Sequence, residues 1–162
     1  MMSFDGFEPK EYWQSIDKFV QHMPPKEEKE LCILKGHLLI EESLNSLIEN
    51  QVVNPTYILR ARFEFYQKLN LAQSMLQLNS DDEWVWKAIE KLNQVRNKMA
   101  HNLAYPGLDD KITDFANFVE KSLAAPSQED QINEFGILHM SIFNVHHTIN
   151  WAVSTKAPNH RL

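Results

Sequence analysis

Between Leu92 and Asn102 the sequence carries side-chain amides, a guanidinium and an imidazole, and two of the amides and the imidazole are spaced four residues apart. Successive helix residues are turned by about 100°, so Asn93, Asn97 and His101 lie on one stripe, with Arg96 one step round from it. An imidazole exchanges protons near neutral pH and a guanidinium binds anions, so an amide stripe that ends in an imidazole beside a guanidinium is an unusual helix face and a candidate site. The alternative is a solvated face whose last-turn histidine is favoured by the helix dipole. The neighbouring apolar face, which can anchor the helix to a core, is formed by Leu92, Val95 and Met99.

The segment Arg96-Asn97-Lys98-Met99-Ala100-His101 resembles the R-x4-H motif of HEPN domains, small all-helical proteins that include many metal-independent ribonuclease toxins. In that family a polar residue commonly follows the arginine, and Asn97 matches. Two upstream segments, residues 34–44 and 61–69, also look like segments of bacterial HEPN-like proteins. The resemblance covers roughly residues 26 to 123.

This resemblance implies a homodimer in which two motif helices meet and two sets of Arg96, Asn97 and His101 line one cleft as catalytic residues. One His101 would take the proton of the RNA 2′-hydroxyl and the other would protonate the leaving oxygen, while Arg96 stabilises charge on phosphate. Asn97 would orient the imidazole or bind phosphate. The residues assigned to binding are Asn93, Lys98, Asn102 and Glu41. We expect no metal and no cofactor, and as partners a second copy, RNA or a nucleotide, and an antitoxin protein.

Three hypotheses stay open at this point. The first is an endoribonuclease, the second a HEPN-like module that binds RNA, nucleotide or protein without cleaving, and the third a dimerising bundle whose motif is only a hydrogen-bond network. One departure weakens the toxin version. HEPN toxins paired with a nucleotidyltransferase antitoxin typically have His-x-Tyr, but Leu103 stands two residues after His101, and Tyr105 is out of register.

Composition and charge set bounds on the fold and its partners. The chain has 162 residues, 43% of them hydrophobic, 4 glycines and a single cysteine, which fits one all-α domain without a disulfide. No basic, apolar leader and no membrane-length apolar stretch are present, so we expect a cytoplasmic protein that does not enter a membrane. The net charge of −6 argues against a broad nucleic-acid footprint, but residues 60–98 hold 7 basic and 5 acidic side chains. This local excess is compatible with a small RNA contact and with a solvated surface.

Apolar spacing predicts a bundle of about six helices, mostly antiparallel and HEPN-like. The expected organisation is an N-terminal accessory helix within 1–25, a helical bundle over 26–156 and a disordered tail at 157–162, with residues 1–8 as a loose arm. A long central helix should run from Lys26 to about Asn50, and another should restart at Pro55. Three caps are expected: within 79–82 for the motif helix, at Asp109 or Asp110 for the next, and at Ser127 for the last.

Other polar residues in the predicted bundle could join the site or serve packing. Glu41 follows His37 by one turn and would need a partner if buried, with Arg96, His101, Arg62 or His37 as candidates; a Glu at the stripe's edge reaching solvent is the simpler interpretation. The last helix carries His139, His146 and His147 without ligand spacing to an acid or cysteine, so we interpret them as bundle histidines. Trp84 and Trp86 lie on different faces, where core packing competes with a stacking role for the more exposed ring.

Overall fold

The computed structural model describes residues 9–155, and this part of the chain is all-helical with eight helices and no strand. The prediction of an all-α fold is therefore confirmed. The expected loose arm at residues 1–8 and the expected tail at 157–162 lie outside the described residues. In chain order the helices are α1 (Lys10–His22), α2 (Lys29–Gln51), α3 (Pro55–Arg60), α4 (Phe65–Met75), α5 (Trp84–His101), α6 (Leu108–Ser122), α7 (Glu129–Phe135) and α8 (Ile137–Thr155).

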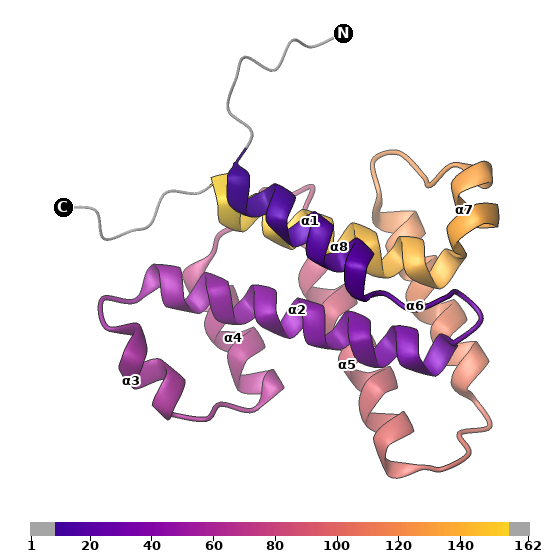
Figure 1. The fold of residues 1–162 in the computed structure, drawn as a ribbon, viewed down its shortest axis with the longest axis horizontal. Helices are drawn as coiled ribbons and strands as arrows, with labels where there is room; N and C mark the ends of the chain where they lie inside the picture. Colours follow the sequence, from indigo (N-terminus) through magenta and orange to yellow (C-terminus); the bar gives the residue numbers. More distant parts are fainter. Residues whose placement is uncertain (1–8, 156–162) are drawn as a thin grey trace, which may run out of the picture.

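Helix α2 is the centre of the bundle and packs against α1, α3, α4, α5 and α8 (Figure 1). Its apolar residues cover much of its circumference, which is what a helix surrounded by others requires. Contacts along it show that α2 and α8 run parallel, since Gly36 meets Ile142 and Ser43 meets Asn150. In contrast, α1 and α8 run antiparallel, because Tyr12 and Phe19 meet α8 in reverse order.

The core is one cluster of hydrophobic side chains contributed by every helix except the two short ones, α3 and α7. Helix α5 contributes Val85, Ala88, Ile89, Leu92 and Val95, all buried. Trp84 and Trp86 are both half-buried and pack against this cluster, so neither ring is an exposed platform. Helix α5 is thus fixed by its apolar face, which leaves the opposite face of its last turns exposed.

Two predicted helices are each broken once, which raises the expected six helices to eight. The predicted helix from Pro55 onward divides into α3 and α4 at Arg62, a non-glycine residue with a φ of 49°. The predicted last helix divides into α7 and α8 at Gly136, whose φ is 84°. A left-handed backbone residue cannot continue a right-handed helix, so both breaks have the same local cause.

The three predicted helix caps are wrong by one to a few residues. Helix α5 is preceded by Glu83, α6 by Gly107 and α7 by Gln128, and none of the predicted side chains occupies the cap. Asp109 and Asp110 lie instead in the first turn of α6, where a carboxylate still complements the helix dipole. Within residues 9–155, no helix combines the length and the apolar character needed to cross a membrane.

Candidate functional site

The motif residues lie at the C-terminal end of α5, whose last residue is His101. Arg96 is half-buried, whereas Asn97 and His101 are exposed on the outer face of the helix. Lys98 and Asn102 are also exposed, and Asn102 donates its side-chain amide to the carbonyl of Lys98 at 2.8 Å. This bond satisfies one of the free carbonyls at the helix end, which gives Asn102 a local capping role.

Asn93 does not share the environment of the other two residues on its stripe. It is half-buried and its Oδ1 accepts a hydrogen bond from Nε2 of His37 at 3.0 Å. This bond places Asn93 against α2, whereas Asn97 and His101 are exposed. Asn93 therefore ties α5 to α2, and the outward-facing set is Arg96, Asn97 and His101.

Arg96 is oriented by its neighbour. Its Nη1 donates to Oδ1 of Asn97 at 3.1 Å, which fixes the guanidinium beside the amide. The NH2 of Asn97 remains able to donate to a ligand. His101 makes no hydrogen bond to any described side chain, so Asn97 orients the arginine rather than the imidazole in the single chain.

His37 is a second imidazole next to the motif helix, and it is buried. Its ring lies against Phe65, with the ring centroids 4.1 Å apart. Burial lowers the pKa of His37 below its usual value, and the nearby Arg96 lowers it further, against the opposing effects of Asn93 and Glu41. His37 is therefore a neutral donor that positions Asn93. In the sequence, the only indication that His37 belongs to this region is that it precedes Glu41 by one helical turn.

Glu41 pairs with Lys68 of α4 at 2.7 Å, with 25% of its side chain exposed. None of the four partners considered from the sequence is the one it uses. The carboxylate is neither fully solvated nor directed at the motif, because α4 crosses α2 here and places its own cation within reach. Lys68 is held by this ion pair and is half-buried.

Exposed leucines lie on α2 and directly after α5. Leu31, Leu34 and Leu38 are spaced i, i+3 and i+7 on α2 and are all exposed, Leu38 by 55%. Leu103, just after α5, is fully exposed. The hollow between them has a volume of only about 160 Å³ and is lined by Leu34, Met99, Ala100 and their neighbours. One chain alone therefore presents the motif on an apolar-edged surface rather than in a cleft.

The histidines of α8 serve the packing of α1 against α8. His147 bonds to the hydroxyl of Tyr12, and His139 donates from Nε2 to the carbonyl of Pro24 at 2.7 Å. His146 is buried beside Phe19, its Nδ1 has no partner among the described residues, and burial lowers its pKa to about 4. In residues 9–155 no three His, Cys, Asp or Glu side chains are arranged to hold a metal ion.

Comparisons with protein-family models, with curated proteins and with solved structures gave no match.

Proposed function

We propose that this chain is a HEPN-like, metal-independent endoribonuclease whose active site forms where two copies of α5 meet. The observation that carries the proposal is the placement of Arg96, Asn97 and His101 together on the outer face of α5, with Arg96 already oriented by Asn97. A protonatable group next to an oriented guanidinium is what acid–base cleavage of a phosphodiester requires.

The chemistry needs two proton transfers. The RNA 2′-hydroxyl loses its proton to one imidazole as its oxygen attacks phosphorus, and the bond from phosphorus to the 5′-oxygen breaks as a second imidazole protonates that oxygen. The products are a 2′,3′-cyclic phosphate and a free 5′-hydroxyl. Arg96 stabilises the negative charge on the phosphate oxygens.

A second copy supplies the second imidazole. Each chain contributes only one His101 to this face, and the hollow beside it is too small to enclose a nucleotide chain. The exposed leucines of α2 next to the motif give the two copies an apolar area to bury around the polar set. A two-fold contact through these leucines would face the two motif helices toward each other and form the cleft.

The activity test uses single-stranded RNA and single-stranded DNA of one sequence in excess chelator. We expect cleavage of the RNA, with a cyclic phosphate end, and no cleavage of the DNA, since DNA lacks the attacking hydroxyl. RNA that stays intact across a broad panel of cellular RNAs would contradict the proposal.

The assembly test is light scattering at high micromolar concentration. We expect a dimer for the parent chain and a monomer for Leu38→Lys, because the symmetric contact would bury the new cation twice. Leu59→Lys is the matched control, since Leu59 is 60% exposed on α3, away from the motif. A parent chain that is monomeric at this concentration would remove the shared site.

One observation favours a second candidate function, RNA or nucleotide binding without cleavage. His101 has no orienting partner in the described chain, whereas Arg96 is held ready to bind an anion. This candidate predicts RNA binding that weakens in Arg96→Ala, with no cleavage by the parent chain.

A further inference from the structure

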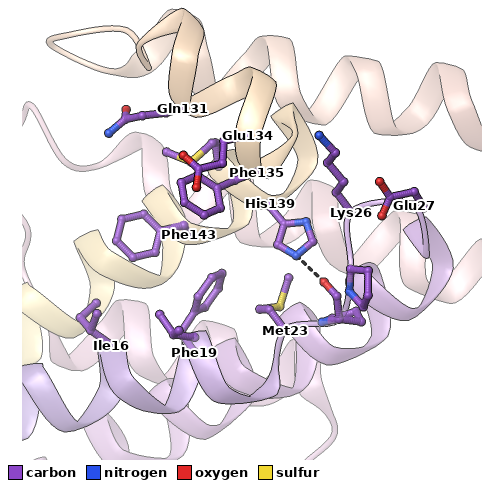
Figure 2. A pocket seen from close by; sticks show the side chains of 14 residues that line it. Ile16, Phe19, Met23, Lys26, Glu27, Gln131, Glu134, Phe135, His139 and Phe143 are labelled. Carbon is purple, nitrogen blue, oxygen red and sulfur yellow. Dashed lines mark hydrogen bonds between the residues drawn. The ribbon is translucent and has the colours of Figure 1, made fainter.

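A hollow of about 780 Å³ lies on another part of the molecule, between α1, α7 and α8 (Figure 2). One wall is Ile16 and Phe19 of α1 with Met23 directly after it, and the facing wall is Phe135, Met140 and Phe143 of α7 and α8. We call this hollow the α1–α7 groove. Phenylalanine and methionine side chains give it large apolar surfaces that adapt to the shape of a ligand.

The polar groups at the end of the groove are already satisfied. His139 donates to the Pro24 carbonyl, and its Nδ1 lies 3.7 Å from Sγ of Cys32. Lys26 donates to the carbonyl of Asn133 at 2.6 Å, at the end of α7. Lys26 keeps its positive charge in this bond, so the lining residues hold one cation beside the two carboxylates of Glu27 and Glu134. This excess of negative charge disfavours an anionic ligand.

The groove has an acidic rim. Glu27 and Glu134 line it, and neither carboxylate makes an ion pair or hydrogen bond with another described residue. Glu134 lies in the last turn of α7, where the helix dipole disfavours a negative charge. The sequence of α7 contains three acidic residues and no basic one. A cation on a bound partner would offset the unfavourable charge of Glu134 at the end of α7.

The groove is open along its side. Val20 and Phe135, both among its lining residues, are 70% and 49% exposed. An enclosed cavity would favour a small apolar molecule, whereas an apolar trough that is open to solvent accepts an extended partner. A membrane surface with anionic lipids would be repelled by the acidic rim.

We propose that the α1–α7 groove binds an amphipathic helix of a partner protein, with apolar residues against Phe19, Phe135 and Phe143 and basic residues against Glu27 and Glu134. This inference is independent of the chemistry at the end of α5, because no residue lines both places. Helix-in-groove recognition of this kind reads apolar anchors at i, i+3, i+4 and i+7.

The test measures fluorescence anisotropy of a labelled model helix made of leucine and lysine at that spacing, with a glutamate-for-lysine version as its control peptide. We expect the lysine peptide to bind and the glutamate peptide to bind much more weakly. Val20→Lys should weaken binding about 10-fold or more by placing a cation in the trough. Val53→Lys is the matched control, since Val53 is 71% exposed and does not line the groove.

The rim is tested separately. Glu27→Gln with Glu134→Gln should weaken binding several-fold and reduce its salt dependence, while Glu28→Gln with Glu129→Gln, just outside the groove, should not. The proposal is overturned if the lysine peptide does not bind, or if the two valine variants weaken binding equally. Binding of the parent chain to vesicles containing phosphatidylglycerol, in place of the peptide, would also overturn it.

Discussion

The end of α5 and the α1–α7 groove differ in two properties, the volume of the hollow and the polar groups that are free to act on a ligand. The groove is already formed in one chain, with a volume of about 780 Å³ and apolar walls, and its His139 and Lys26 are hydrogen-bonded to backbone carbonyls of the fold. The end of α5 has uncommitted polar groups but a hollow of only about 160 Å³. In Figure 1 the loop after α5 lies at the bottom of the view and α7 at the upper right.

This difference separates binding from chemistry. Apolar volume alone gives affinity without a reacting group, so the groove fits a docking role. Half-buried Arg96 and exposed His101 are not enclosed in one chain, so the proposed reaction needs a second surface to exclude water and position a substrate. Variants that affect one region and leave the other unchanged are therefore the informative ones.

The largest expected effect is on the α5 side. Arg96→Ala should slow RNA cleavage by about 10²–10³-fold, because it removes the cation that stabilises the phosphate in the transition state. Arg60→Ala is the matched control, since Arg60 is exposed on α3 next to Tyr57. Initial rates on one single-stranded RNA measure both. Equal rates for the two variants would remove Arg96 from the site.

The next effect is the pH dependence of folding stability that the buried His146 of α8 causes. His146, with its pKa lowered to about 4 by burial, stays neutral in the fold but takes up a proton on unfolding below about pH 6.5. The unfolded state then binds more protons than the folded state. The free energy of unfolding should therefore fall as the pH drops from about 6.5 to about 4, by on the order of 3 kcal/mol from this residue. The lowered pKa values of His37, His139 and His147 act in the same direction.

Urea unfolding at pH 7 and pH 5 measures this loss. His146→Leu should reduce the difference between the two pH values, whereas His22→Leu, at an exposed position, should leave it unchanged. The neighbours that set the charge around His146 are Lys18 of α1 and His147 of α8. A pH dependence that is the same in both variants would show that His146 does not titrate with unfolding.

The sequence predicts those features of the structure that depend on local helix geometry better than those that depend on contacts between distant segments. Apolar spacing located the long helices, including the motif helix from about Asp82, because the face buried in the core is set by helix geometry. The breaks were missed for different reasons. Gly136 is the residue type that a left-handed position favours, but Arg62 carries no such signal. Its φ of 49° lies between α3 and α4, which each pack against α2.

The same limit applies to the candidate site. Helical spacing alone places Asn93, Asn97 and His101 on one stripe, yet α2 covers only the first of them, through His37. The pairing of Glu41 with Lys68 likewise depends on where α4 crosses α2. Contacts between helices distant in sequence decide these partners, and local spacing carries no information on them.

A smaller effect is expected where α2 meets α8, the contact that connects the two regions. A Cβ added at Gly36 would lie 2.7 Å from Cγ2 and 2.9 Å from Cδ1 of the buried Ile142. Gly36→Ala should therefore lower the free energy of unfolding by about 1–2 kcal/mol, since overpacking exceeds the gain in helix propensity. Gly107→Ala, whose Cβ would meet only ordinary contacts at 3.8 Å, should cost less in the same urea measurement. If Gly36→Ala is as stable as the parent chain, α8 can move away from the added methyl group at no cost in free energy.

The smallest effect distinguishes two adjacent glutamates. Glu41→Gln breaks the partly buried pair with Lys68 beside His37, whereas Glu42→Gln breaks an exposed pair with Lys18. We expect about 1 kcal/mol for the first and less for the second. Glu41→Gln should also change activity or dimerisation more, because Glu41 neighbours His37, which is hydrogen-bonded to Asn93 of α5. Equal effects in unfolding and light scattering would place Glu41 among ordinary surface residues.

The most direct test of the central claim is the rate of RNA cleavage by His101→Ala in excess chelator, with His22→Ala as its matched control. Both histidines are exposed in the last turn of a helix, but only His101 follows an oriented arginine. We predict a rate 10²–10⁴-fold lower for His101→Ala, the usual contribution of general acid–base catalysis, and an unchanged rate for His22→Ala. A His101→Ala variant that cleaves as fast as the parent chain would contradict the account.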